Sequence, residues 1–327
     1  MARILSGVQP SGDVHLGNYL GALRHWVALQ HDNDAFYCVV DLHALAQEHD
    51  TALLAPRTLE AATHLLAAGL DPSACALFAQ SHVPEHPRLA WLLECTATVG
   101  ELRRMTQFKD KGGESESVRV GLFTYPVLQA ADILLYDAER VPVGDDQRQH
   151  LELTRDLAIR FNHHHGDTFV VPEAAVPPVA ARVMDLQEPT RKMSKSVSSP
   201  LGTILVLDRP QEIDRKIRKA VTDTETSVRY DPVSKPGVSN LLELLAAASG
   251  GDPAVLADGY TSYGPLKADV AEALIALLSP VRQRYEEFTA DPGYVTSVLA
   301  EGAAKAHAVA AATLDRAMRA AGLLPPA

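Results

Sequence analysis

Short, unbroken apolar runs divide the first half of the chain. They are Ile4-Leu5, Phe36-Tyr37-Cys38-Val39-Val40, Ala76-Leu77-Phe78-Ala79 and Val141-Pro142-Val143. Because polar residues do not alternate within them, these runs predict strands that are buried on both faces of a parallel sheet. Between them, apolar residues recur at helical spacing, as in Leu16, Leu20, Leu23 and Val27, and again in Leu53, Leu59 and Leu65-Leu66. This alternation of strand and helix predicts a doubly wound α/β domain.

The pattern changes after residue 185, where strand signals become sparse. Helical spacing continues in Ile213, Ile217 and Val221, in Leu241-Leu242 and Leu244-Leu245, in Leu274, Leu277 and Leu278, and in an alanine-rich tail over residues 293–318. We therefore predict an α/β domain over residues 1–185, a smaller all-helical domain over 186–290, and a C-terminal helix over 291–327 that packs back on the first domain. The glycines and charges of residues 108–118 predict a mobile loop.

Polar residues cluster where the predicted strands end. Ser6-Gly7 with Gln9, Asp41 with His43, Gln80, and Asp145-Asp146-Gln147 all follow apolar runs. In open parallel sheets, ligands bind beyond the carboxyl ends of the strands. We therefore expect these residues to surround a ligand site.

The charge of the chain excludes indiscriminate nucleic-acid binding. The 327 residues carry a formal net charge of −11, whereas non-specific binders of nucleic acid depend on positive charge. The acid is unevenly placed, since residues 1–185 hold 14 Lys+Arg and 24 Asp+Glu while residues 186–235 hold 10 and 7. Within the latter segment, Arg215, Lys216, Arg218 and Lys219 predict a solvated helix face, and this limited basic surface leaves selective RNA recognition open.

The sequence also gives no indication of a membrane protein or of a structural metal site. No apolar run reaches the roughly 20 residues that span a bilayer, and the N-terminus has no signal-peptide core, so we expect a cytoplasmic protein with no membrane partner. Cys38, Cys75 and Cys95 form no C-x-x-C pair, which predicts buried free thiols and neither zinc nor an iron–sulfur cluster. His163-His164-His165 predicts a solvated helix end rather than a metal site.

Two segments have residues that can bind phosphate groups. In residues 6–19, His15 and Asn18 enter at a helix N-terminus, where free amides attract phosphate, and Gly17 leaves a bare surface on which adenine can lie. Alone, this segment is equally compatible with an ordinary strand–turn–helix connection. Residues 192–196, Lys-Met-Ser-Lys-Ser, carry two ammonium groups that can offset charge on a leaving pyrophosphate, although a solvated basic turn is the alternative. Their place near the predicted domain junction suits a loop that closes over a nucleotide.

Together the two segments carry a family resemblance. His15-Leu16-Gly17-Asn18 resembles the HIGH signature of class I aminoacyl-tRNA synthetases, with Asn18 in place of the final histidine, and residues 192–196 match their KMSKS signature. More closely, the chain resembles the bacterial tryptophanyl-tRNA synthetases over essentially its whole length, through residues 6–23, 100–109, 125–136, 141–161, 192–196 and 235–242. The resemblance implies a Rossmann-type nucleotide-binding domain followed by a helical anticodon-binding domain.

The resemblance also implies where ATP binds. The expected ATP-binding residues are Gln9, Pro10, Ser11, Gly17, Asn18, Gly144, Asp145, Asp146, Val183, Lys192, Met193, Ser194, Lys195 and Ser196. Among the expected catalytic residues, Lys192 and Lys195 would stabilise the pyrophosphate side, while His15, Asn18 and Gln9 would orient the phosphates. Lys111, on the predicted loop, would join these phosphate contacts. Mg²⁺ would be held mainly by the phosphates, without a carboxylate cage. After the KMSKS signature, residues 197–200 lack the acidic Asp-Pro-Asn of other members.

The tryptophan side chain is expected to be bound by residues 125–147. An indole N–H only donates, so a buried pocket for it needs an acceptor, and Asp132 lies in an apolar setting that suits this role. A helix cap or an ion-paired carboxylate is the structural alternative. The resemblance implies Asp132 as the indole acceptor, Tyr125 and Gln147 as head-group ligands, and His43, Leu5, Val40 and Val143 as pocket wall. Gln129 stands where many bacterial members have methionine, and its amide can bond the indole or point at the ammonium group.

The implied reaction has two steps. The tryptophan carboxylate attacks the α-phosphate of ATP to give tryptophanyl-adenylate and pyrophosphate, and the acyl group then passes to tRNA(Trp). No side-chain nucleophile is needed, so catalysis rests on positioning and charge stabilisation. The family forms homodimers bridged by tRNA.

Three alternatives stay open: tyrosine specificity, a small-molecule adenylyltransferase, and a paralogue with an antibiotic-resistance or regulatory role. Tyrosine specificity is disfavoured because tyrosyl enzymes place the aspartate in a Gln-Ala-Tyr-Asp context, whereas residues 129–132 are Gln-Ala-Ala-Asp.

Overall fold

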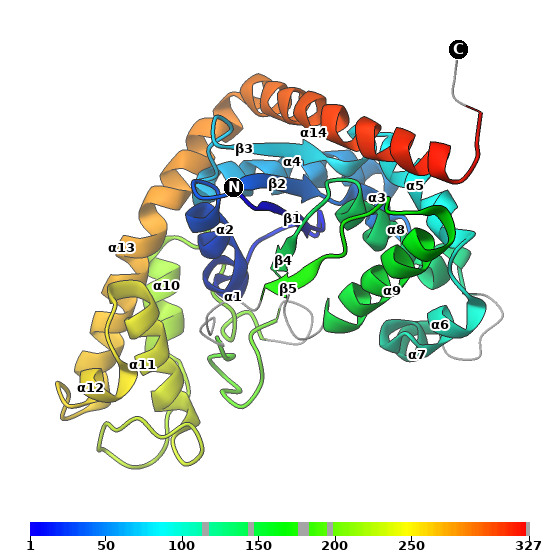
Figure 1. The fold of residues 1–327 in the computed structure, drawn as a ribbon. Coiled ribbons are helices and arrows are strands. Elements are labelled where there is room, and N and C mark those ends of the chain that lie inside the picture. The colour runs from blue at the N-terminus through cyan, green and yellow to red at the C-terminus, as the bar shows by residue number, and fades with distance from the viewer. Residues whose placement is uncertain (113–117, 143–146, 176–182, 195–198, 325–327) are drawn as a thin grey trace.

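Five parallel strands form one sheet in the order β3-β2-β1-β4-β5 (Figure 1). The computed structural model describes residues 1–112, 118–142, 147–175, 183–194 and 199–324, with the backbone alone for residues 110–112. The strands are β1 (Arg3–Val8), β2 (Asp34–Val39), β3 (Cys75–Ala79), β4 (Arg140–Pro142) and β5 (Glu173–Ala175). Because β4 returns to pair with β1, the direction of winding reverses between these two strands. The predicted doubly wound α/β class is confirmed.

Helices cover both faces of the sheet. On one face, Ile4, Tyr37 and Leu77 share an apolar core with α1, the π-helical η1, α2 and α4. On the other, Leu5 and Phe78 share a core with α5, α6, α8 and α9. Neighbouring strand residues therefore face opposite cores, which explains why the strands contain unbroken apolar runs. The helices of this half are α1 (Leu16–Asn18), η1 (Tyr19–Leu23), α2 (Arg24–Leu29), α3 (Asp41–Ala44), α4 (Thr51–Ala68), η2 (Gln80–His82), α5 (Glu85–Glu94), α6 (Val99–Arg104), α7 (Thr106–Gly112), α8 (Val120–Leu134) and α9 (Arg148–His165).

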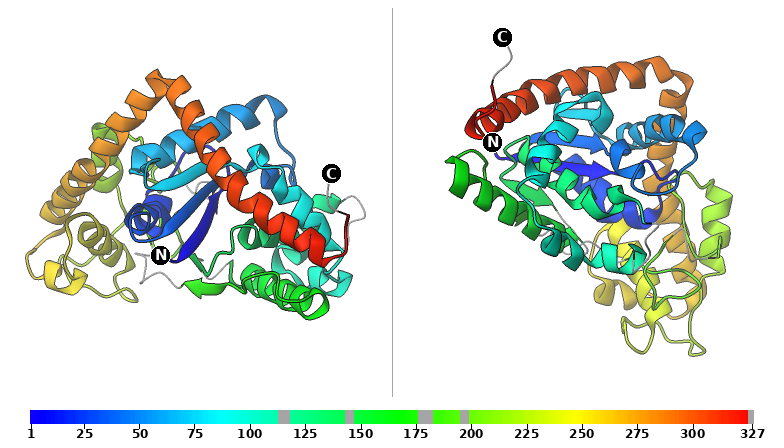
Figure 2. Two further views of the ribbon diagram at one scale, coloured as in Figure 1. Left: turned by 45° about the horizontal axis from the view of Figure 1, so that its top comes forward. Right: turned by 90° about the vertical axis from the view of Figure 1, so that its right-hand side faces the viewer.

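The second half is helical and docks on the first face of the sheet. It comprises α10 (Pro210–Arg218), α11 (Pro236–Ser249), α12 (Pro253–Ala257) and α13 (Tyr263–Ala290), which gather at one end of the molecule (Figures 1 and 2). Ile217, Leu241 and Leu274 are fully buried, and they belong to the same apolar core as Ile4 and Tyr37. The helical region is thus packed continuously against the α/β region.

The last helix, α14 (Pro292–Ala320), lies along the outer strand of the sheet (Figure 1). A Cβ on Gly302 would stand 1.9 Å from the backbone oxygen of Leu77 in β3, so only glycine allows this approach. Farther along, Ala306 and Ala310 are completely buried, and Arg316 pairs with Asp137 at 2.6 Å. The helix thereby covers an edge strand that would otherwise expose unpaired backbone groups.

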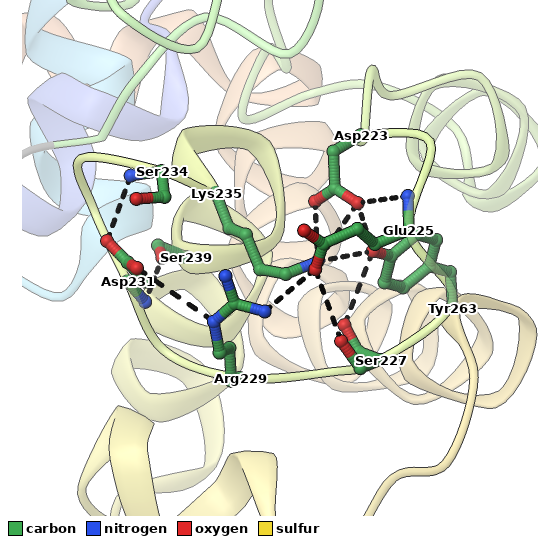
Figure 3. A network of polar contacts seen from close by, with 9 residues as sticks. All are labelled: Asp223, Glu225, Ser227, Arg229, Asp231, Ser234, Lys235, Ser239 and Tyr263. Atoms are coloured by element: carbon green, nitrogen blue, oxygen red, sulfur yellow. Dashed lines mark hydrogen bonds and ion pairs between the residues drawn. The ribbon is translucent and has the colours of Figure 1, made fainter.

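A buried lysine organises the loop between α10 and α11 (Figure 3). The side chain of Lys235 is 1% exposed, and its Nζ donates to Asp223 Oδ1 and Oδ2 at 2.9 and 3.0 Å and to the Tyr263 hydroxyl oxygen at 2.9 Å. Glu225 lies 3.0 Å from the same nitrogen. Burial alone would lower the pKa of Lys235, but the hydrogen bonds to Tyr263 and Asp223 outweigh it and raise the pKa. The cluster ties the loop to α11 and α13.

Several local predictions are wrong. Strand β5 was not predicted, because its three residues are largely exposed and form no apolar run. Residues 108–112 of the predicted loop belong instead to the helix Thr106–Gly112. Phe108 packs edge to face on Phe123 with 5.0 Å between ring centroids, and Gln149 accepts from the backbone of Thr106. Residues 113–117, the rest of that predicted loop, lie outside the described residues.

Two surface predictions also need correction. Cys38 and Cys75 are buried free thiols, but Cys95 is exposed because it follows the last residue of α5. Lys216 is buried and pairs with Asp208 at 2.5 Å, so the basic face of α10 consists of Arg215, Arg218 and the adjoining Lys219. The predicted solvated helix end is confirmed, since the three histidines that end α9 are exposed. No helix among the described residues is long and apolar enough to cross a membrane.

Candidate functional site

A cavity opens at the carboxyl ends of β1 and β4, where the winding of the sheet reverses. Its volume is about 450 Å³, within the range typical of small-molecule sites. The lining residues come from β1, β2, β4, α3, α8 and the segments beside them: Leu5, Ser6, Gly7, Gln9, Trp26, Cys38, Val40, His43, Ala46, Gln47, Gln107, Leu122, Tyr125, Gln129, Asp132, Ile133, Val141, Pro142, Gln147 and His150. Seven of the eight residues predicted to bind the amino acid therefore line one cavity, and the eighth, Val143, lies outside the described residues.

Asp132 is the buried acid of this cavity. Its Oδ2 lies 2.7 Å from His43 Nε2, and its Oδ1 lies 2.6 Å from both Gln80 Nε2 and His86 Nδ1. The ring of His86 continues the chain of contacts to the Tyr136 hydroxyl, 2.8 Å from Nε2. Burial alone would raise the pKa of Asp132, but the charge and hydrogen bond of His43 and the hydrogen bond and charge of His86 outweigh it and hold the pKa well below its usual range. The cavity thus contains a carboxylate at neutral pH.

The head-group residues form two further pairs. The Tyr125 hydroxyl lies 2.8 Å from His150 Nε2, and burial raises the pKa of Tyr125 to about 12, so the phenol stays protonated. Gln129 Nε2 donates to Gln147 Oε1 at 3.1 Å. The Gln129 amide is thereby held by Gln147.

The turn between β1 and α1 carries the first signature. Gln9 lines the cavity, Pro10 is buried, and Ser11 and Asn18 are exposed beside it. His15 is the N-cap of α1, where its Nδ1 accepts from the backbone N–H of Asn18 at 3.3 Å. This ring is therefore held by the turn itself, which gives His15 a structural task besides the predicted phosphate contact.

The second signature is linked to the first through Val183. Met193 N donates to Val183 O at 3.0 Å, and Val183 lies against Gly17, where an added Cβ would be 3.6 Å from the Val183 side chain. Downstream, Leu16 N donates to Ile204 O at 2.8 Å. Met193 is buried and Lys192 is exposed, so the segment presents its first lysine outward. The predicted adenine surface at Gly17 and the start of the second signature are brought together.

Part of the predicted ATP site cannot be placed. Gly144, Asp145, Asp146, Lys195 and Ser196 lie outside the described residues, as does the side chain of Lys111. Ser194 is half-buried, and its carbonyl accepts from the Thr203 hydroxyl at 3.2 Å. Among the described residues, no group of three or more His, Cys, Asp or Glu side chains could hold a metal ion.

Sequence reasoning missed several residues that hold the site in place. His86 reaches Asp132 from α5, and Tyr136, which follows α8, contacts His86. Neither has a local pattern that points to a pocket. Gln80 was noted only as a polar residue at a strand end. Asn240 on α11 accepts from Met184 N at 3.0 Å and donates to Met184 O at 3.1 Å, which links the helical region to the segment beside Gly17. Its position inside the resembling segment 235–242 was the available signal.

Comparison with known proteins agrees with the geometry. Residues 1–279 match the family model described as tRNA synthetases class I (W and Y). The chain is 56% identical to tryptophan–tRNA ligase 1 of Streptomyces coelicolor, over 100% of this chain and 98% of the relative.

Solved structures give the same result. The tryptophanyl-tRNA synthetase of Mycoplasma pneumoniae superposes with a TM-score of 0.89 at 36% identity, over 99% of this chain and 98% of the other. That of Campylobacter jejuni, solved with ADP and tryptophan, superposes with a TM-score of 0.85 at 34% identity, over 98% of this chain and 100% of the other. The chain therefore belongs to the class I tRNA synthetases of the tryptophan and tyrosine group.

Proposed function

We propose that the chain is an ATP-dependent tryptophan–tRNA ligase. In the first step, a tryptophan carboxylate oxygen bonds to the α-phosphorus of ATP while the bond to the bridging oxygen breaks and pyrophosphate leaves. In the second, a terminal ribose hydroxyl of tRNA(Trp) attacks the acyl carbon, AMP leaves and the hydroxyl proton is released. The observation that carries this proposal is the buried carboxylate of Asp132 in a cavity at the sheet's switch point, in a chain 56% identical to a tryptophan–tRNA ligase.

The cavity has the parts that tryptophan requires. Asp132 would accept from the indole N–H, while Tyr125 and Gln147 would bind the amino and carboxylate groups at the other end. A phenylalanine side chain offers no donor at the indole position and would leave the buried carboxylate without that partner, which is costly. The pocket therefore favours tryptophan over phenylalanine by a lost interaction rather than by size. Tyrosine has an O–H donor, so its rejection depends on where that donor would stand relative to Asp132.

The ATP side rests on the turn at Gly17 and on residues 192–196. Adenine would lie over Gly17 and Val183, while Lys192 and Lys195 would offset charge that develops on pyrophosphate. Gln9 lines the cavity and Asn18 is exposed on the same turn, where they could orient phosphates, and Lys111 would join them. Mg²⁺ would be held mainly by the ATP phosphates and would help to offset their negative charge.

One assay series tests the function directly. ATP–pyrophosphate exchange should depend on tryptophan and should be at least about 10²-fold weaker with tyrosine or phenylalanine. Charging of tRNA(Trp) should follow. Preference for tyrosine would overturn the specificity. Exchange without charging would indicate an adenylyltransferase, and neither activity would indicate a binding or regulatory paralogue.

The same assay tests the second signature. Lys195→Ala should lower kcat for exchange strongly, about 10²-fold or more, because this charge contact would strengthen as the pyrophosphate bond breaks. The KM for tryptophan should change little. An unaltered kcat would remove Lys195 from the proposed chemistry.

We further propose a cytoplasmic homodimer in which residues 1–185 carry out activation and residues 186–290 bind the anticodon stem. Trp91 on α5 is 66% exposed, beside a second hollow of about 310 Å³ lined mainly by apolar residues of α3, α5 and α8. His43 and Tyr125 line both hollows, so a partner subunit here would lie next to the tryptophan site. Trp91→Glu should yield monomers in analytical ultracentrifugation, whereas an unchanged sedimentation coefficient would place the interface elsewhere.

A further inference from the structure

Within the part of the chain that the structure describes, the partners of Asp132 leave it with a single open acceptor position. A carboxylate offers about four lone-pair sites, two on each oxygen. Gln80 and His86 fill both sites of Oδ1, and His43 fills one site of Oδ2. The one remaining site belongs to Oδ2, on a residue that lines the cavity.

The orientation of the first donor is fixed by a second contact. Gln80 Oε1 accepts from the backbone N–H of Leu42 at 3.2 Å, so its Nε2 must face Asp132. Gln80 is completely buried, which prevents water from replacing either contact.

His86 is held at both ring nitrogens. Asp132 is ionised and can only accept, so His86 Nδ1 carries a proton and donates it to Oδ1. The Tyr136 hydroxyl lies 2.8 Å from Nε2, and both side chains are completely buried. Loss of this hydroxyl would leave the ring held at Nδ1 alone.

We propose that His86 and Tyr136 are positioning residues that determine selection for an N–H donor, because they fill Asp132 Oδ1 and leave only the Oδ2 position for the indole. This inference rests on the proposed function and assigns the selectivity to residues that do not line the cavity. If His86 were lost, Oδ1 would regain an open acceptor site, and the carboxylate could rotate or bind water. A substrate without the N–H would then be tolerated better.

The test compares tryptophan with 3-(3-benzothienyl)alanine, which has the same bicyclic shape but sulfur in place of the N–H. The ratio of their kcat/KM values is measured by ATP–pyrophosphate exchange on the full chain. For the unmodified protein we expect a ratio of about 10² or more in favour of tryptophan. In His86→Leu the ratio should fall at least about 10-fold, mainly through a higher KM for tryptophan. His86→Asn, whose amide can take the place of Nδ1–H, should retain most of the ratio.

The matched control is His64→Leu, the same change at a buried histidine outside the cavity lining. It should leave the ratio unchanged. An unchanged ratio in folded His86→Leu, or an equal loss for both substrates, would overturn the proposal. So would an Asn variant that behaves like the Leu variant.

If His86→Leu does not fold, Tyr136→Phe decides the question, since it removes one hydroxyl and retains the ring. Its ratio should fall about 2–5-fold, and an unchanged ratio would overturn the proposal. Failure of the proposed function looks different, because the unmodified protein would then show no tryptophan-dependent exchange.

Discussion

Two buried charged networks, one around Lys235 and one around Asp132, differ in whether every donor or acceptor of the central charge has a partner. Around Lys235, the carboxylates of Asp223 and Glu225 and the Tyr263 hydroxyl provide a partner for each of the three N–H groups of the ammonium. Around Asp132, three donors among the described residues occupy three of the four acceptor sites of the carboxylate. Lys235 does not line the cavity, whereas Asp132 does.

This difference separates a structural charge from a binding charge. Both side chains are almost fully buried, so each needs partners to offset the loss of hydration. In a complete network, such as that of Lys235, every N–H already has a partner, so none remains for a ligand, and the network stabilises one loop conformation. An incomplete network beside a cavity has one unmet interaction, which a ligand of the right chemistry can satisfy. Four predictions test this distinction.

The largest effect is expected at the incomplete network. Asp132→Asn replaces two acceptor oxygens with one, while Gln80, His43 and His86 all still present donors. The amide must therefore set its own N–H₂ against one of them, and its remaining oxygen cannot serve every partner. We expect weaker but not abolished binding, with a KM for tryptophan about 10²-fold higher in pyrophosphate exchange. A KM within a factor of two of the unmodified value would contradict Asp132 as the indole acceptor.

At the complete network, stability should change and substrate binding should not. Lys235→Met keeps the volume but leaves Asp223 and Glu225 without their cation, so the Tm should fall by several degrees in calorimetry. The KM for tryptophan should be unchanged. Arg319→Met, which breaks an exposed ion pair with Asp315 on α14, is the control and should leave the Tm almost unaltered. A changed KM for tryptophan without a lower Tm in Lys235→Met would contradict the assignment of Lys235 as a structural charge.

The complete network should also be sensitive to pH at both extremes. Burial alone would raise the pKa of Asp223, but hydrogen bonds from Tyr263 and Lys235 lower it, and the hydrogen bond from Lys235 lowers the pKa of Glu225. Their contributions are present above the unfolded values of 3.8 and 4.5 and disappear as the pH falls through the folded values.

The pKa of Lys235 is raised, so its contribution is complete below the unfolded value of 10.5 and disappears as the pH rises through the folded value. The Tm difference between the unmodified chain and Lys235→Met should therefore be constant from about pH 5 to about pH 10 and shrink outside that interval. A difference that does not vary with pH would show that the network contributes through packing alone.

The smallest effects come from removing one hydroxyl from each network. Tyr263→Phe removes a partner of Lys235 and should lower the Tm by a few degrees with no change in selectivity. Tyr136→Phe removes the partner of His86 and should have the opposite profile, a changed selectivity ratio and a smaller shift in Tm. Calorimetry and exchange assays on the same two variants give the comparison, and identical profiles would remove the distinction between the networks.

The sequence predicted the strands well where burial is symmetrical. The runs that became β1, β2 and β3 were visible because both faces of the sheet are covered, which requires apolar residues at every position. It failed at β5, which is short and exposed, and at α7, where the contact between Phe108 and Phe123 overrides the nearby glycines.

The candidate site divides in the same way. Asp132, Tyr125 and Gln147 were predicted because their segments resemble a family, and Gln147 also because it follows a predicted strand. His86 was not, because its contact with Asp132 joins residues 46 positions apart through the packing of α5 on α8. A histidine in an amphipathic helix has no local mark that distinguishes a surface position from a place beside a buried acid.

The sequence alone determined the fold class, the family and several residues that line the cavity, because hydrophobic periodicity and short motifs are local properties of the chain. Tertiary structure decided which acceptor sites of Asp132 are occupied, that Asn240 supports the segment beside Gly17, and that each N–H of the Lys235 ammonium has a partner. These facts depend on distances between side chains from different elements. Packing fixes such distances, and a linear pattern does not encode them.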